Sequence, residues 1–80
     1  MFKVYIIQSQ KNRRYYIGYT SNLEQRLRYH NSGKNKSTKL GAPWKLVLEE
    51  MFGTRKEAWL REHQIKSYKG GEAFKKLIAN

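Results

Sequence analysis

Residues 2–20 read FKVYIIQSQKNRRYYIGYT, and this segment predicts the first two strands of a sheet. Along residues 2–7, side chains that are mostly aromatic or β-branched alternate with a period of two, which is the pattern of a β-strand. A polar segment follows at residues 11–14, and residues 15–19 form a second aromatic run. Two strands joined by a short polar turn most simply pair as an antiparallel hairpin. We therefore predict a hairpin at the start of the chain.

The predicted hairpin sorts its side chains onto two faces. Tyr5 and Ile7 share one face of the first strand, and Tyr16 and Gly18 share one face of the second. Gly18 has two interpretations, because a glycine in a strand marks a bulge or strand end, or leaves room for a backbone or phosphate group beside Tyr16. The sequence leaves both interpretations open.

A helix is predicted directly after the hairpin. Ser21 and Glu24 have the spacing of a capping box, and Gly33 is a suitable C-terminal stop, so we expect the helix over roughly residues 22–31.

The predicted helix has one packed stripe. Leu23, Leu27 and His30 lie at positions i, i+4 and i+7, and this spacing turns them toward the sheet. Arg26 borders the stripe, whereas Arg28 points to solvent.

The rest of the chain predicts three further elements. A basic loop covers residues 34–42, a third strand covers residues 44–52, and a helix begins at a Thr54/Glu57 capping box and runs to about Lys69. A short helix over residues 72–78 ends the chain. The fold class is therefore α+β, a three-stranded, largely antiparallel sheet flanked by helices in the order β-β-α-β-α-α. Eighty residues suffice for one domain, residues 1–80.

The amino-acid composition favours some classes of partner and excludes some classes of metal site. Seventeen Lys and Arg against six acids give a net charge of +11, more than the magnitude of about 2–8 that solubility needs, so a polyanion such as nucleic acid is the expected partner. All six acids are Glu, which excludes clustered-Asp metal sites. The chain has no cysteine, so it has no disulfide-linked partner and no thiolate zinc site. It also lacks an apolar membrane span and a signal peptide, and we expect a cytoplasmic protein that does not bind membranes.

Three segments carry a family resemblance: residues 3–5 (KVY), residues 16–18 (YIG), and residues 22–26 (NLEQR) leading to His30. Together they resemble the GIY-YIG nuclease family, which cuts phosphodiester bonds with one divalent metal ion. The resemblance is to small single-domain members, which are similar to the N-terminal nuclease domain of a DNA-repair excinuclease. It covers nearly the whole chain, implies the same α+β fold, and departs from the family only in Lys3 and Val4 of the first triplet.

The resemblance implies a metal site at Glu62, where a glutamate on the second major helix is the sole protein ligand of Mg²⁺ or Mn²⁺. The sequence places Glu62 at the border of the packed stripe of its helix, where a carboxylate is costly to desolvate unless it is paired or binds a cation. The alternative is a structural salt bridge to Arg61, to Lys66 or to an arginine across the sheet.

Catalytic roles are implied for four other residues. Arg26 matches the family arginine that holds the scissile phosphate, and its alternative is a surface arginine paired with Glu62. Tyr5 and Tyr16 match the tyrosines that orient and deprotonate the attacking water, and we expect the dense positive charge to favour a phenolate. Each could instead only pack in a strand. His30 matches a histidine that positions a tyrosine or contacts phosphate, and its alternative is a helix-end residue.

The remaining candidates contact nucleic acid. Lys66 either neutralises a phosphate or ties down Glu62 one helical turn away. Asn80 matches an asparagine near the end of the family domain, and His63 is interpreted as a surface residue. The contacts expected in the basic loop, with Thr38 as a phosphate donor, are Lys34, Lys36, Thr38 and Lys39.

The predicted function is a metal-dependent endonuclease that acts on DNA, in repair or in the processing of structured DNA. So small a domain has little surface for reading bases, which favours branched, nicked or single-stranded targets over a long specific sequence. RNA is the other possible substrate. Two alternatives stay open: a non-catalytic nucleic-acid-binding module of the same fold, and an adaptor whose basic face binds an acidic protein or ribosomal RNA.

Overall fold

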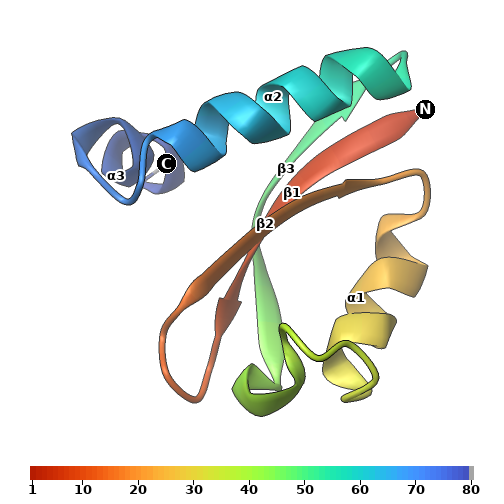
Figure 1. Ribbon diagram of the computed structural model, residues 1–80, viewed down its shortest axis with the longest axis vertical. Coiled ribbons are helices and arrows are strands. Elements are labelled where there is room, and N and C mark those ends of the chain that lie inside the picture. The colour runs from red at the N-terminus through yellow and green to blue at the C-terminus, as the bar shows by residue number, and fades with distance from the viewer. Residues whose placement is uncertain (80) are drawn as a thin grey trace.

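The computed structural model describes residues 1–79 and contains a three-stranded sheet with helices on both faces (Figure 1). The element order is the predicted one, and the third strand and last helix have the predicted bounds. The elements are β1 (Phe2–Ser9), β2 (Tyr15–Thr20), α1 (Leu23–Asn31), the 3₁₀ turn η1 (Lys39–Gly41), β3 (Trp44–Phe52), α2 (Arg55–Ser67) and α3 (Glu72–Ile78). No helix within residues 1–79 is both long enough and apolar enough to cross a membrane.

The sheet has the strand order β2-β1-β3, and both pairs of neighbours are antiparallel. The predicted hairpin is thus confirmed, and β1 is the central strand. In the register of β1 with β2, Tyr5 lies opposite Gly18 and Ile7 lies opposite Tyr16. Because β2 has no neighbour on its other side, the tyrosines of the hairpin lie close to an open edge of the sheet.

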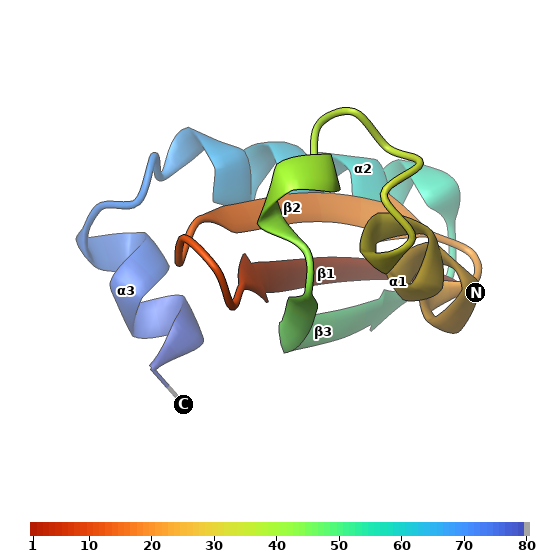
Figure 2. The same cartoon turned by 90° about the horizontal axis from the view of Figure 1, so that it is seen from below.

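The alternation of side chains along β1 creates two cores, one on each face. Val4 and Ile6 pack with residues of α2 and α3 on one face, including Ala58. Tyr5 and Ile7 pack on the other face, with α1 and with Trp44. Both views show this arrangement, with α2 and α3 on one side of the sheet and α1 and η1 on the other (Figures 1 and 2). The side chains of β1 are therefore enclosed by helices on both faces of the sheet.

The start of α1 differs from the prediction. Asn22 is the N-cap, and its side-chain oxygen accepts a hydrogen bond from the Gln25 backbone N–H at 3.0 Å. The Asn22 N–H itself donates to the Thr20 hydroxyl oxygen at 3.1 Å, which holds the chain in the turn before the helix. The Ser21/Glu24 capping box is therefore wrong, because an asparagine one residue later takes the capping position. Glu24 pairs with Arg28 instead, at 3.1 Å.

The start of α2 confirms the prediction, since Thr54 and Glu57 form a reciprocal capping box. Its end comes earlier than expected, at Ser67. Lys69 has a φ of 50° and Gly70 a φ of 75°, so both residues are left-handed and the helix cannot continue through them.

Candidate active site

Gly18 makes room for Tyr5. A Cβ atom at Gly18 would lie 2.7 Å from the Tyr5 hydroxyl oxygen and 2.9 Å from the ring carbon that carries it. Such distances are too short for non-bonded atoms, so only glycine lets the Tyr5 ring lie across β2. The space that the missing side chain leaves is thus filled by Tyr5. It is neither a bulge nor an opening for phosphate.

The Tyr5 hydroxyl begins a buried chain of hydrogen bonds. It lies 2.8 Å from Nε2 of His30, and Nδ1 of His30 lies 3.0 Å from the Thr38 hydroxyl. The Thr38 carbonyl in turn accepts a hydrogen bond from Nε1 of Trp44 at 2.8 Å. His30 and Thr38 are fully buried, and Tyr5 is only 2% exposed. The chain therefore fixes the position of the Tyr5 hydroxyl from below the surface.

This arrangement corrects the prediction for Thr38. The sequence suggested a phosphate donor in a basic loop, but Thr38 is buried and its hydroxyl is bonded to His30. The hydroxyl has no access to a phosphate from solvent. Thr38 instead holds His30, and His30 holds Tyr5, which is an indirect contribution to the site.

Burial governs the protonation of both groups. Burial raises the pKa of Tyr5 well above its usual value, the neighbouring Tyr16 raises it further, and the charge of Arg26 only partly opposes them. The expectation that the positive field favours a phenolate is therefore wrong for Tyr5, which stays protonated. Burial, with a smaller contribution from Arg26, lowers the pKa of His30 to about 4. His30 is thus neutral near pH 7, so one of its ring nitrogens donates and the other accepts.

Tyr16 lies beside this chain and is more accessible. Its ring centroid is 4.7 Å from that of His30 and 6.4 Å from that of Tyr5. Tyr16 is half-buried, and its hydroxyl has no hydrogen-bond partner among residues 1–79. Of the two tyrosines, Tyr16 is therefore the one whose hydroxyl is free to meet a ligand.

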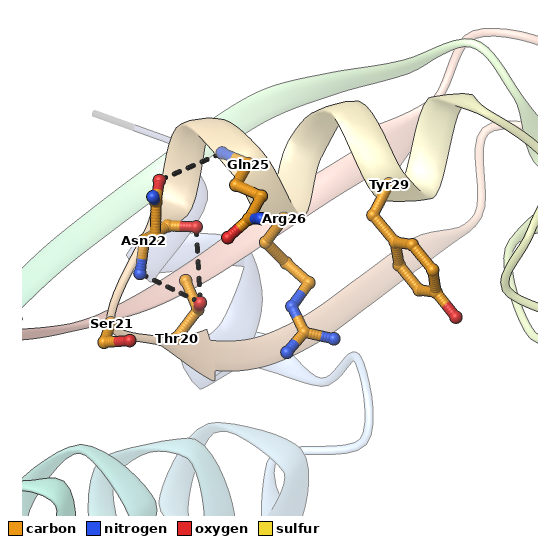
Figure 3. Close-up of a pocket in the computed structure, with 6 residues that line it drawn as sticks. All are labelled: Thr20, Ser21, Asn22, Gln25, Arg26 and Tyr29. Carbon is orange, nitrogen blue, oxygen red and sulfur yellow. Dashed lines mark hydrogen bonds between the residues drawn. The ribbon is translucent and has the colours of Figure 1, made fainter.

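Arg26 lines a pocket of about 340 Å³ at the end of β2 (Figure 3). Its guanidinium extends along the end of this strand, and the central guanidinium carbon lies 5.7 Å from the centroid of the Tyr29 ring. Within the described residues no carboxylate pairs with Arg26, so the alternative of an Arg26–Glu62 salt bridge is not observed. The six residues that line the pocket are Thr20, Ser21, Asn22, Gln25, Arg26 and Tyr29.

Tyr29 is a further residue of this pocket and was not among the predicted site residues. It lies three positions after Arg26 on the same helix, and this spacing brings the two side chains together. An arginine over an aromatic ring gains a cation–π attraction, which restricts the guanidinium to one side of the pocket. The i, i+3 spacing was the signal that could have identified it.

Glu62 lies on α2 and is buried, with an exposed fraction of 9%. Its carboxylate accepts no hydrogen bond from residues 1–79. Its carboxylate has two longer contacts, an ionic one of 3.5 Å to the Lys66 ammonium and one of 3.7 Å to Nδ1 of His63. Arg61 pairs with Glu50 instead, at 2.7 Å. The structural alternative of a Glu62 salt bridge is thus realised only loosely, by Lys66. The charge of Glu62 also reaches Tyr5 and contributes to raising the pKa of that phenol.

A single carboxylate without hydrogen bonds is a suitable donor for a hydrated cation. No cluster of three or more histidine or acidic side chains that could hold a metal ion exists in the described part of the chain. Zinc prefers such a cluster, whereas Mg²⁺ keeps several waters and takes one or two carboxylates plus phosphate oxygens. The residues present therefore fit Mg²⁺ or Mn²⁺ at Glu62.

The predicted basic contacts lie outside this group. Lys34, Lys36 and Lys39 are exposed on the segment between α1 and β3. Lys66 is also exposed, next to Glu62, and His63 lies on the surface as predicted. Asn80 lies outside the described residues. The structure thus brings Tyr5, Tyr16 and His30 together by contact, whereas Arg26 and Glu62 affect Tyr5 only through their charges, Arg26 by lowering and Glu62 by raising its pKa.

Comparison with known proteins agrees with this geometry. The sequence model of the GIY-YIG catalytic domain matches residues 1–75. The chain belongs to the GIY-YIG family. The domain of this family is generally a nuclease domain. The predicted family and fold are therefore confirmed.

Relatives of this GIY-YIG protein occur in bacteria and archaea. It is 41% identical over 75 residues to a UPF0213 protein of Staphylococcus haemolyticus, covering 92% of this chain and 90% of the relative. It is 46% identical over 66 residues to a UPF0213 protein of Haloquadratum walsbyi, covering 81% and 73%. The solution NMR structure of a UPF0213 protein from Bacillus halodurans superposes with a TM-score of 0.61 at 31% identity, covering 99% of this chain and 84% of that one.

Proposed function

We propose that this GIY-YIG protein is a metal-dependent endonuclease that hydrolyses phosphodiester bonds in DNA, in repair or in the processing of structured DNA. One observation carries the proposal. Arg26 lines a pocket and pairs with no carboxylate among residues 1–79, and Tyr16 lies beside the buried Tyr5–His30 hydrogen bond with its own hydroxyl free in the described chain. Arg26 and Glu62 come from helices on opposite faces of the sheet and form no ion pair with each other in the described chain, and the Glu62 carboxylate has only its longer contacts with Lys66 and His63.

Arg26 is the proposed phosphate ligand. Its guanidinium is exposed, unpaired within residues 1–79 and restrained by Tyr29. A planar guanidinium binds two phosphate oxygens at once and offsets the negative charge that develops as water attacks phosphorus. Removal of the side chain should therefore lower the cleavage rate more than the affinity for DNA.

The two tyrosines divide the handling of the attacking water. Tyr5 stays protonated and hydrogen-bonded to His30, so its role is to orient the water through its oxygen. The Tyr16 hydroxyl has no partner in the described chain, and we assign it the role of general base, in which its phenolate form would take the proton that the water loses and become a neutral phenol. The water oxygen attacks phosphorus and displaces the leaving oxygen directly. No covalent intermediate between the protein and the DNA is therefore needed. A Mg²⁺ or Mn²⁺ ion at Glu62 would supply charge stabilisation and a water of lowered pKa.

The basic side chains outside the site hold the strand. Lys34, Lys36, Lys39 and Lys66 are exposed and contribute to a net charge of +11. Contacts of this kind bind phosphate without reading sequence. This composition supports the structure-selective activity on DNA that the sequence predicted.

A cleavage panel tests the proposal. Labelled duplex, single-stranded, flap and junction DNA are incubated with Mg²⁺, Mn²⁺ or EDTA, using wild type, Arg26→Ala and the matched control Arg28→Ala. Arg28 lies on the same helix and pairs with Glu24 on the surface. We expect cutting that needs the metal and that falls about 100-fold or more in Arg26→Ala but not in Arg28→Ala. Binding without cleavage on every substrate would overturn the proposal in favour of a non-catalytic binding module.

A further inference from the structure

Helix α2 exposes an aromatic pair that the proposed chemistry does not use. Trp59 is 44% exposed although it is among the most apolar side chains of the molecule. Its indole packs on the imidazole of His63, with ring centroids 4.1 Å apart and planes inclined by 42°. We call these two side chains the Trp59–His63 platform. Neither belongs to the two hydrophobic cores, so packing within the fold does not explain why a tryptophan is here.

The platform is held in place. Nδ1–H of His63 donates a hydrogen bond to the Trp59 carbonyl oxygen, at 3.1 Å, and Glu62 lies 3.7 Å from the same nitrogen. These contacts fix the orientation of the imidazole beneath the indole. A surface that is already ordered loses little conformational entropy when a flat ligand covers it.

The platform lies on the flank of α2 that carries Glu62. Ala58 and Ile65 face the sheet, and Arg61 marks the flank toward β3, where it pairs with Glu50. Successive residues of a helix rotate by about 100°, so Lys66, Trp59 and then His63 follow Glu62 around the helix away from Arg61. The aromatic surface therefore begins beside the carboxylate that we assign to the metal.

The positive charge around the platform determines which class of ligand would bind there. Two exposed basic side chains, Lys56 and Lys66, border the platform, and the whole chain carries +11. A second copy of the same chain carries the same charge and is repelled. A polyanion with flat apolar groups meets both features, and a nucleic-acid strand with unstacked bases is such a polyanion.

We propose that the Trp59–His63 platform stacks an unpaired base next to the phosphate that Arg26 binds, and thereby selects strands with unpaired nucleotides. This inference rests on the proposed function, because it places the base relative to the scissile phosphate. Bases inside a duplex are stacked on one another and offer no free face. An unpaired base gains about 1–3 kcal/mol by stacking on an aromatic side chain.

Binding without cleavage provides the test. Fluorescein-labelled oligothymidine, an abasic strand of the same length and a hairpin duplex are titrated in EDTA against wild type, Trp59→Ala, Trp59→Leu and Trp59→Phe. Leu60→Ala is the matched control, since Leu60 is 50% exposed on the same helix. We expect both non-aromatic variants to bind oligothymidine at least about fivefold more weakly, with no change for the abasic strand or the duplex. Trp59→Phe and Leu60→Ala should bind like wild type.

Two results would overturn the inference: equal weakening for the abasic strand, or no weakening for oligothymidine in either non-aromatic variant. Trp59→Leu keeps the apolar bulk, so it separates loss of stacking from loss of fold. The outcome is independent of catalysis. Base-dependent binding through Trp59 without cleavage under any metal would sustain the platform and refute the nuclease, whereas cleavage with no dependence on Trp59 would do the reverse.

Discussion

His30 shows how one residue organises the site. Its two ring nitrogens bond to Tyr5 and Thr38, so a single imidazole connects the central strand, α1 and the segment before β3. A charged imidazole would have to be desolvated there, which is why its pKa falls to about 4. Protonation of His30 would disturb the hydrogen bonds to Tyr5 and Thr38, so the geometry of the site depends on the pH of the solution.

The lowered pKa of His30 predicts acid sensitivity. Above the reference value of about 6.5, the imidazole is neutral in both folded and unfolded chains, and this source of stability is complete. Below it the unfolded chain takes up the proton first, so stability is lost as the pH falls from about 6.5 to about 4. The shift corresponds to about 3 kcal/mol.

Urea unfolding at several pH values measures this loss, with His30→Gln as the test and His63→Gln as the surface control. The difference in free energy of unfolding between wild type and His30→Gln should shrink by about 3 kcal/mol between pH 6.5 and pH 4. A constant difference would contradict the assignment.

Gly18 allows a second test, of the close packing of Tyr5 across β2. In Gly18→Ala the new methyl group meets the Tyr5 hydroxyl, so Tyr5 must shift away from His30. We expect a loss of about 1–3 kcal/mol in the free energy of unfolding, together with slower cleavage. Gly53→Ala is the control, because its Cβ would meet nothing closer than 3.7 Å. Equal stability of the two variants would show that Tyr5 is not confined by Gly18.

Sequence patterns anticipated some residues of the site and not others. The motif positions Tyr5, Tyr16 and Glu62 were predicted because their spacing is local or family-specific. The hydrogen bond from His30 to Thr38 was not, since it joins a helix to a loop whose path no periodicity predicts. The protonation of Tyr5 was misjudged because net charge is visible in the sequence and burial is not.

At the scale of the elements, strands and helices were predicted well. Alternation along β1 fixes which side chains face each core, and the Thr54/Glu57 capping box fixes the start of α2. The errors fall at helix ends. Asn22 and Ser21 are both good N-caps, and the choice between them depends on the hydrogen bond from Asn22 to Thr20, which needs the turn after β2.

The N-cap of α1 can be tested by substitution of Asn22 and Ser21. Asn22→Ala removes the acceptor of the Gln25 N–H and should cost about 1 kcal/mol in the free energy of unfolding. Ser21→Ala should change it by less than about 0.5 kcal/mol, because Ser21 does not cap the helix. Thermal or urea unfolding of the two variants distinguishes them, and the opposite ranking would restore the Ser21/Glu24 capping box.

For the molecule as a whole, charge governs association. The net charge of +11 is spread over the described surface, with no separate basic tail. The affinity for DNA should therefore fall steeply with salt, with the logarithm of the binding constant decreasing linearly against the logarithm of salt concentration.

Single lysine variants test which contacts take part. Lys36→Ala should reduce the slope by about 0.7 for a single strand. Lys11→Ala, in the turn between β1 and β2, is the control and should leave it unchanged. A slope that is the same in both variants would remove the segment between α1 and β3 from the binding surface.

The proposed nuclease activity depends most on Glu62, which would anchor the metal that cleavage requires. The most direct measurement compares wild type, Glu62→Gln and Tyr16→Phe for cleavage of labelled DNA in Mg²⁺ or Mn²⁺, with DNA binding measured in parallel. We predict metal-dependent cutting by wild type, a loss of at least about 100-fold in each variant, and unchanged binding. Cutting by Glu62→Gln at the wild-type rate would contradict the claim.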